Sequence, residues 1–455
     1  MQTGNQTALR RELTLFDAAA IIIGIMIGSG IFFIPTYVFG RAGAPGLALL
    51  VWVAAGVVSV LSGLCYAELG AALPKAGGSY VYLKQAFGPM WAFLNTWTSF
   101  LIGGPGSIAA LAVAFATYTS FFLSLSALGV KLLAIGAVVF LTAINIIGVR
   151  QGALVQRIFT VAKVIPIIVI IVFGLIRGQV GEFTPLLPQA GGGSLVGAFG
   201  MAMIAALWAF TGWANVNSVA EELKNPARDL PRAMMLGVGG VTLLYLLFNV
   251  ALLKVMPMAD IVANNRPAAV AATTLFGSIG GAVIAGGALI SIFGSTNGCV
   301  LAFPRNYFAM ARDGLFWGRL AEISPRYGTP VVSLLSSAAL SIVLILSGSF
   351  DQLTNLVVFS GMIFTTMVVA SLFVLRRTMP DLPRPYRVVG YPVVPIVVLL
   401  LNLWLLFNTL MEDPRTSLIG LVVPLLGIPV YYWFSRRNAA RLNSAAAVLE
   451  PGNDD

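Results

Sequence analysis

The chain has 455 residues, of which 58% are hydrophobic and only 10% are charged. Soluble globular proteins carry about 25% charged residues, and apolar stretches of about 20 residues recur here along the whole length, so the composition indicates a helical membrane protein. The formal net charge is +10 and there is no histidine, which excludes a histidine-based metal site. A transmembrane β-barrel would instead show alternating segments of about 10 residues.

Twelve apolar segments of membrane-spanning length are expected along the chain. The predicted fold class is therefore an all-α membrane protein with 12 transmembrane helices. The expected spans are 15–39, 46–73, 86–117, 131–149, 156–177, 197–221, 231–256, 277–304, 330–348, 354–376, 390–410 and 416–434.

The distribution of cations predicts the orientation. When the amino terminus is placed inside, most of the 27 Lys and Arg residues fall on the cytoplasmic side. The sequence thus predicts a multi-pass protein of the cytoplasmic membrane, in contact with membrane lipid, with cytoplasmic tails at 1–14 and 435–455. Because topology explains the positive charge, no nucleic-acid partner is expected.

One charge-free stretch tests this orientation. Residues 85–130 carry no charged side chain and are broken only by glycines and a proline at Gly103–Gly106. If this stretch formed two short spans, the membrane orientation of every later segment would be reversed, and most of the cations would lie outside. We therefore expect a single long span.

Two of the expected helices are interrupted. Gly28–Ser29–Gly30 lies within the first span, and the sixth span contains Trp208–Asn217, "WAFTGWANVN". The second break lies five spans after the first, an odd number, so the two helices run in opposite directions, as in an inverted five-helix repeat with discontinuous helices 1 and 6. The predicted repeats cover 15–177 and 197–376, and helices 11 and 12 (390–434) lie outside them.

Such breaks have a chemical use. The amino-terminal end of one half-helix presents free N–H groups to a carboxylate, and the carboxy-terminal end of another presents carbonyls to an ammonium. An amino acid zwitterion carries both groups on one carbon. The alternative is that the small residues at 28–30 only permit close helix packing.

The motifs of this chain resemble those of the amino acid–polyamine–organocation superfamily, and most closely its L-type (LAT) branch and bacterial homologues. The resemblance implies a LeuT-type 5+5 inverted-repeat fold and amino acid transport, usually by obligatory exchange. The motifs that carry it are "GSGIF" and "AFTGW" in the interrupted spans, Glu221–Ala233 "EELKNPARDLPRA", Phe293–Gly314 "FGSTNGCVLAFPRNYFAMARDG" and Met379–Val388 "MPDLPRPYRV".

The resemblance also implies a substrate site at the two breaks. The carboxylate would meet the backbone at Gly28, Ser29 and Gly30, and the carbonyls of Met26 and Ile27 would face the amine. The amine and side chain would lie near Trp208, Ala209 and Thr211, with Trp208 as an aromatic gate or, alternatively, a packing residue. Thr211 stands where the family often has glycine, which narrows the pocket and favours small neutral side chains.

Lys163 lies about two turns inside the fifth span, where burial of an ionisable group is costly and indicates function. In sodium-coupled relatives of this fold an ion bridges the first and eighth helices, and the resemblance implies that this lysine replaces it. We expect Lys163 to donate to the carbonyls near Gly28 and to hydroxyls of the eighth span, with Ser291 a candidate. A merely structural or snorkelling lysine is the alternative.

Acids are absent near both breaks, since Asp17 and Glu221 lie at cytoplasmic ends. Glu68, late in the second span, is expected to pair with a cytoplasmic-side cation, and a gate element or proton carrier is the alternative. A neutral substrate is therefore favoured. The predicted function is sodium-independent exchange of small neutral L-amino acids such as alanine, serine or threonine. A proton-coupled symporter with Lys163 as its protonation switch is the alternative. No catalytic residues or cofactors are expected, and an enzyme or channel is disfavoured.

Cysteine usage bears on partners. Cys65 and Cys299 both lie in apolar runs, so no disulfide framework is implied. In the LAT-type proteins of eukaryotes a cysteine between the third and fourth spans joins a heavy chain, but the corresponding segment here, Thr117–Lys131, has none. The resemblance therefore implies no disulfide-linked heavy chain, and a monomer or homodimer.

Overall fold

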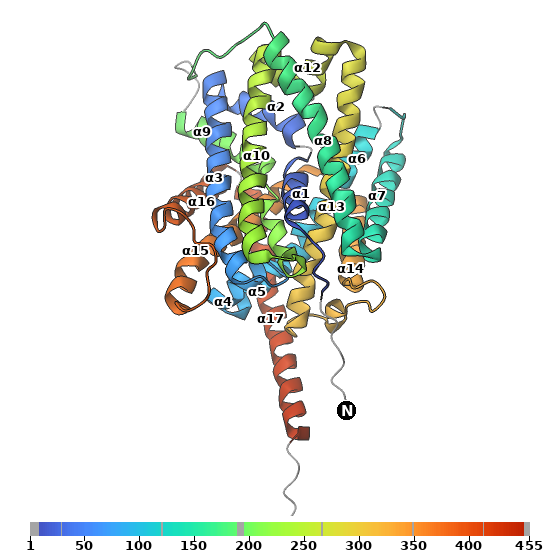
Figure 1. Ribbon diagram of the computed structural model, residues 1–455, viewed down its shortest axis with the longest axis vertical. Helices are drawn as coiled ribbons and strands as arrows, with labels where there is room; N and C mark the ends of the chain where they lie inside the picture. Colours follow the sequence, from blue (N-terminus) through green and yellow to red (C-terminus); the bar gives the residue numbers. More distant parts are fainter. Residues whose placement is uncertain are drawn as a thin grey trace, which may run out of the picture.

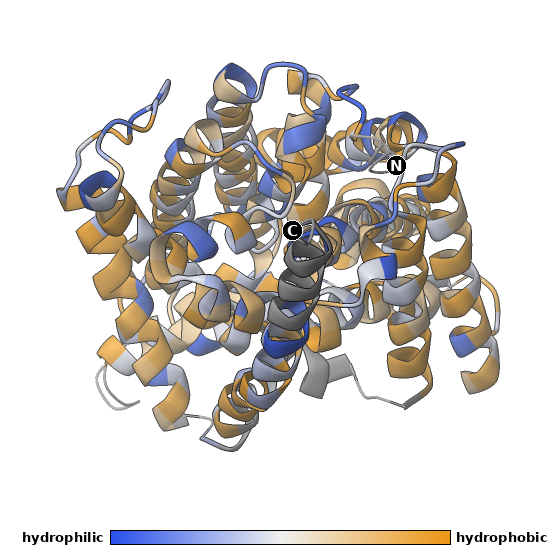
Figure 2. Cartoon of the chain, turned by 90° about the horizontal axis from the view of Figure 1, so that it is seen from below, coloured by the Kyte–Doolittle hydropathy of each residue, from blue (hydrophilic) through white to orange (hydrophobic). Residues whose placement is uncertain are grey.

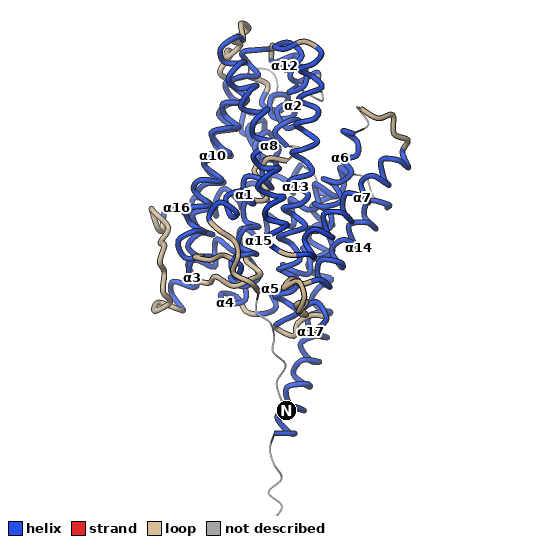
Figure 3. Tube along the Cα trace, turned by 45° about the vertical axis from the view of Figure 1, so that its right-hand side comes forward, coloured by secondary structure: helices blue, strands red, loops and turns tan. Residues whose placement is uncertain are grey.

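The structure is a computed structural model that describes residues 9–28, 30–119, 122–188, 195–264, 267–347, 350–412 and 414–449. The described residues are overwhelmingly helical, as Figure 3 shows, and their only β-type pairing is one parallel bridge between Leu13 and Leu223. The all-α fold class predicted from composition is confirmed for this part of the chain.

The helices follow one another with short connections. In chain order they are α1 (Leu15–Met26), α2 (Gly30–Ala42), α3 (Pro45–Ala72), α4 (Ser79–Phe87), α5 (Pro89–Thr98), the π-helical turn η1 (Ser99–Gly103), α6 (Gly104–Thr119), α7 (Ala127–Ile147), α8 (Val149–Arg177), α9 (Leu195–Ala209), the 3₁₀-helix η2 (Trp213–Glu222), α10 (Pro226–Val255), α11 (Met258–Ala263), α12 (Pro267–Phe276), α13 (Ser278–Arg312), the 3₁₀-helix η3 (Gly318–Ala321), α14 (Val331–Ser347), α15 (Phe350–Thr378), α16 (Val393–Glu412) and α17 (Pro414–Leu449).

Among the described residues, nine helices are long and apolar enough to cross a membrane. The pair α1 and α2, bent by 47° at its break, makes a tenth when counted as one span. Hydrophobic residues predominate on the helices around the perimeter in Figure 2, as expected for helices that face lipid. These observations define a multi-pass membrane protein. The full count of twelve spans stays a prediction.

The charge-free stretch forms one span, Pro89–Thr119, built from α5, η1 and α6. The prediction of a single helix here is confirmed, and the glycines lie inside it. Gly104 begins α6 at a point where an added Cβ would come within 3.0 Å of the Phe303 side chain. Glycine at this position therefore allows α6 to pack closely against α13.

Two short helices between the seventh and eighth expected spans were not predicted. Pro257 is the N-cap residue of α11, and Pro267 is the first residue of α12. Proline suits a first helical turn because it has no N–H to be satisfied there. These helices are too short to cross a membrane, and α12 lies at the upper end of the molecule in Figure 1.

The first described residues and the carboxy-terminal end of α17 leave the molecule at the same end, near α4 (Figure 1). Both ends of the described chain therefore lie on one side of the helix bundle. That this side is the cytoplasm stays a prediction from the distribution of cations.

Candidate functional site

The two helix breaks lie against each other at the centre of the molecule. Gly30, the first residue of α2, faces Ala209, the last residue of α9. A Cβ added to Gly30 would lie 3.1 Å from the Cα and 3.2 Å from the Cβ of Ala209. A side chain at position 30 would therefore crowd the backbone of α9, so glycine favours the close packing of the two breaks apart from any role in binding. Ser29, also expected in the site, lies outside the described residues.

The first break ends one helix and begins another within three residues. The Ile27 N–H donates to the Ile23 carbonyl at 2.9 Å, and the Gly28 N–H turns back to the Met26 carbonyl, also at 2.9 Å. The first N–H groups of α2 have no acceptor within their own helix, because they precede its first turn. The amino-terminal end of α2 can therefore attract a carboxylate.

The second break is a tight turn after α9. The Thr211 N–H and hydroxyl both reach the Trp208 carbonyl, at 3.1 Å and 2.8 Å. Gly212 has a φ of 106°, a conformation that favours glycine, and an added Cβ there would contact the Ile25 side chain of α1. Thr211 is exposed, so its side chain faces open space rather than the packed core.

Both breaks line one cavity of about 330 Å³. Of the predicted substrate residues, Met26, Gly28, Gly30, Trp208, Ala209 and Thr211 line this cavity. Ile27 does not line it. No charged side chain lines the cavity among the described residues. Its polar lining consists of neutral side chains: Ser59, Ser62, Tyr66, Ser79, Asn95, Thr98, Ser99, Ser107, Thr211, Asn215, Ser218, Asn306, Ser360, Thr365 and Asn402.

The carbonyls of Met26 and Ile27 already have partners. The Met26 oxygen accepts from the Gly28 N–H at 2.9 Å and from the Tyr245 hydroxyl at 2.7 Å. The Ile27 oxygen accepts from Lys163 Nζ at 2.7 Å, from the Ser291 hydroxyl at 2.8 Å and from the Ser295 hydroxyl at 3.0 Å. Both oxygens therefore already have donors inside the protein in this conformation.

Lys163 of α8 is fully buried and is surrounded by oxygen atoms. Its Nζ lies 2.6 Å from the Gly24 carbonyl, 2.7 Å from the Ile27 carbonyl and 3.0 Å from the Ser291 carbonyl. The hydroxyl that it reaches is that of Ser295, at 3.1 Å. Ser291, the residue singled out from the sequence, offers Lys163 its backbone carbonyl and directs its hydroxyl to the Ile27 carbonyl.

Tyr245 of α10 is a residue of the site that the sequence analysis missed. Its hydroxyl lies 2.7 Å from the Met26 carbonyl and 3.1 Å from the Ala209 carbonyl, so it joins the ends of α1 and α9. The ring packs edge-on against Trp52 and Phe210. The available signal was a hydroxyl inside an otherwise apolar span, since a buried tyrosine hydroxyl usually has a hydrogen-bond partner.

Glu68 lies away from this cavity and forms a structural cluster. Its carboxylate receives a bidentate pair of bonds from Arg376, at 2.8 and 2.6 Å, and lies 3.6 Å from Arg384. It also accepts from the Val388 N–H at 2.6 Å. The expected pairing of Glu68 with a cation is confirmed.

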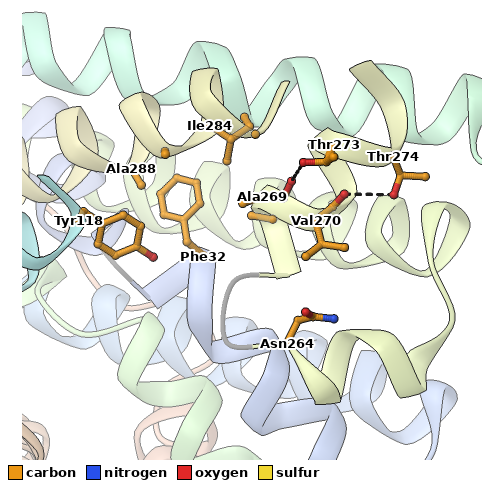
Figure 4. A pocket seen from close by; sticks show the side chains of 12 residues that line it. Phe32, Tyr118, Asn264, Ala269, Val270, Thr273, Thr274, Ile284 and Ala288 are labelled. Atoms are coloured by element: carbon orange, nitrogen blue, oxygen red, sulfur yellow. Dashed lines mark hydrogen bonds between the residues drawn. The ribbon is translucent and has the colours of Figure 1, made fainter. Parts of the chain in front are cut away.

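A second cavity, of about 630 Å³, lies on the other side of the first turn of α2. Gly30 lines the first cavity and Phe32 lines the second. Figure 4 shows Phe32 facing the α13 residues, while the Thr273 and Thr274 hydroxyls of α12 bond to carbonyls of their own helix. This second cavity is therefore largely apolar.

Broken helices that meet at a central, uncharged cavity in a multi-pass membrane protein define a secondary transporter. The chain belongs to the amino acid permease family, whose model matches residues 13–432. The resemblance drawn from the sequence motifs is thereby confirmed.

The chain is similar to several characterised transporters over nearly its whole length. It is 38% identical to the serine/threonine exchanger SteT of Bacillus subtilis, over 95% of this chain and 98% of that protein. It is 34% identical to the mouse b(0,+)-type amino acid transporter 1, over 94% of this chain and 88% of that protein. It is 35% identical to the human large neutral amino acids transporter small subunit 2, over 94% of this chain and 81% of that protein. These relatives are transporters rather than enzymes.

Proposed function

We propose that the protein exchanges small neutral L-amino acids, such as alanine, serine and threonine, across the cytoplasmic membrane by alternating access, without sodium. The observation that carries this proposal is the uncharged cavity of about 330 Å³ that both helix breaks line. Its relative from Bacillus subtilis is a serine/threonine exchanger, which agrees with a small polar substrate.

The cavity supports a neutral substrate on chemical grounds. A cationic side chain would require a carboxylate in the lining and an acidic one would require a cation, and the described lining has neither. The substrate carboxylate binds at the amino-terminal end of α2, near Gly28 and Gly30. The substrate side chain lies toward Trp208, near the end of α9, and Thr211 in the second break.

The surroundings of Lys163 support sodium independence. Three backbone carbonyls and one hydroxyl surround its ammonium group within 3.1 Å. Oxygen donors of this kind are what a hard cation such as sodium would also require. Lys163 therefore fills the position with its own amine and ties the break in α1–α2 to α13.

The proposed architecture follows the sequence prediction. Twelve spans form a 5+5 inverted repeat over 15–177 and 197–376, with 390–434 outside it and both tails cytoplasmic. No disulfide-linked heavy chain is involved, since Thr117–Lys131 has no cysteine. The protein works as a monomer or homodimer in membrane lipid.

The test is uptake of labelled L-serine into proteoliposomes that contain the purified protein. We expect uptake when the lumen holds unlabelled L-serine and background uptake when it is empty. Sodium should have no effect, and L-alanine and L-threonine should compete whereas L-lysine and L-glutamate should not. Accumulation in empty liposomes under an inward proton gradient would overturn exchange and establish the alternative, a proton-coupled symporter.

A further inference from the structure

The middle of α1 is held to α8 by two side chains other than Lys163. Gln156 Nε2 lies 3.4 Å from the Ala20 carbonyl, and the Thr160 hydroxyl donates to the same oxygen at 3.0 Å. Ala20 lies inside α1, so its carbonyl also belongs to the hydrogen-bond ladder of that helix. This contact uses the backbone of α1 and therefore does not depend on any polar side chain there.

Gln156 is oriented by two further amides. Asn297 of α13 donates from Nδ2 to Gln156 Oε1 at 2.9 Å and to the Gly152 carbonyl at 3.0 Å. Asn145 of α7 donates in turn to Asn297 Oδ1 at 2.9 Å. The Gln156, Asn297 and Asn145 side chains are fully buried. Because Asn297 Nδ2 donates to Gln156 Oε1, the other end of the Gln156 amide, Nε2, faces α1 and the Ala20 carbonyl.

The Gln156 amide occupies the point where α1, α8 and α13 meet. A Cβ added to Gly24 would clash with Gln156 Nε2 and lie 2.5 Å from the Thr160 hydroxyl. A Cβ added to Gly298 of α13 would clash with the Ile25 side chain and lie 3.3 Å from Gln156 Nε2. The absence of side chains at Gly24 and Gly298 thus leaves room for the Gln156 amide. The contact between Gln156 and the Ala20 carbonyl is lost when α1 moves away from α8.

We propose that Gln156 is a positioning residue for transport. Acting with Thr160 on the Ala20 carbonyl, it holds the middle of α1 against α8, and the transport cycle must break and remake this contact whenever α1 moves. The proposal rests on the transport function proposed above. Gln156 does not line the substrate cavity, so it affects the position of α1 rather than the choice of substrate.

A natural thiol can report the position of α1. Cys299 lines the cavity, is 2% exposed, and follows Gly298, which packs against Ile25 of α1. Displacement of α1 uncovers this side of α13. In a Cys65→Ala background Cys299 is the one remaining thiol, because the sequence contains two cysteines. Its rate of labelling by a small maleimide therefore measures how often α1 leaves its place.

The test compares Gln156→Leu with Gln151→Leu, a matched change at an exposed position of the same helix. We expect Gln156→Leu to label about threefold faster or more, the factor that one average side-chain hydrogen bond between membrane helices supplies. Its maximal exchange rate should fall by a similar factor or more, while the ranking of competing amino acids is unchanged. Gln151→Leu should match the parent protein in all three measurements.

Thr160→Val provides a second route if Gln156→Leu does not fold. It removes a donor to the same carbonyl at nearly constant volume and should shift labelling in the same direction, whereas Thr117→Val on α6 should not. Labelling of a folded variant at the parent rate, with parent exchange kinetics, overturns the proposal. Labelling needs no substrate, so a protein that fails to exchange amino acids would refute the proposed function and leave this test intact.

Discussion

At the scale of single residues, one lysine amine and two serine hydroxyls together pair with the carbonyl oxygens at the first helix break. The helix break exposes the Ile27 carbonyl, and Lys163 and the Ser291 hydroxyl both bind it. In the membrane such groups have no water to satisfy them, so an internal donor is required. The sequence could predict that Lys163 was buried. It could not predict whether Ser291 or Ser295 supplies the hydroxyl, since the two are four residues apart and share one face of α13.

Lys163→Ala should abolish exchange while the protein remains folded. The change removes the ammonium from its four oxygen partners, and Ser291 and Ser295 are left to hold the break alone. Uptake of L-serine into loaded proteoliposomes should fall to background, with an unchanged gel-filtration profile in detergent. Lys131→Ala, at a partly exposed lysine that bonds to the Leu346 carbonyl, is the control. Parent-level turnover of Lys163→Ala would contradict the proposed role.

Thr211→Gly should change the ranking of substrates, whereas Gly30→Leu should abolish all of them alike. Thr211 is exposed to the cavity, so removing its side chain enlarges the part that receives the substrate side chain. Gly30 lies so close to Ala209 that a leucine side chain would push the two breaks apart. A competition panel of alanine, serine, threonine, leucine and phenylalanine against labelled serine measures the difference. Thr211→Ser keeps the hydroxyl and separates its effect from that of volume; an unchanged order in Thr211→Gly would refute the assignment.

At the scale of elements, the break positions were predictable and their partners were not. Glycines at 28, 30 and 212 mark both interruptions, because each is a poor helix former or adopts a positive φ. Which side chain of α10 reaches the two breaks depends on how α10 packs against α1 and α9, and these helices are far apart in the sequence. Tyr245 binds the last carbonyl of both α1 and α9, a contact that no local pattern specifies.

Tyr245→Phe should weaken exchange without a large loss of stability. The ring keeps its contacts with Trp52 and Phe210, but the carbonyls of Met26 and Ala209 lose their common donor. We expect the maximal exchange rate to fall several-fold, in line with about 1 kcal/mol for one hydrogen bond. Tyr307→Phe is the matched control, because this buried hydroxyl bonds to the Ser99 carbonyl on another pair of elements. Equal effects of the two variants would show that the bridge between the breaks has no special role.

At the scale of the whole molecule, composition and cation placement predicted the helical membrane class and a single span at 86–117. Both are confirmed, and the structure places this span at Pro89–Thr119. The pairing of spans in space depends on buried polar contacts that are far apart in the sequence. The Glu222–Arg305 pair is an example, since it joins η2 to α13 with both side chains 0% exposed. Neither residue stands out in a sequence where many charges flank apolar segments.

Glu222→Ala should therefore destabilise the protein far more than Glu221→Ala. The Glu222 carboxylate lies 2.7 Å from Arg305 Nε, and removing it leaves a buried guanidinium without its counter-charge, which costs about 3–5 kcal/mol. Glu221 is 20% exposed, pairs with a 33% exposed Arg312 at 3.1 Å and accepts from the Ala76 N–H at 2.9 Å, so its loss should cost about 1–2 kcal/mol. Thermal unfolding in detergent measures the two neighbouring variants under the same conditions.

The double variant Glu222→Leu with Arg305→Met tests the same pair by a second route. Because an apolar pair leaves no buried charge, it should recover most of the decrease in the unfolding midpoint caused by Glu222→Ala. A larger loss in Glu221→Ala than in Glu222→Ala would show that the buried pair does not hold η2 to α13.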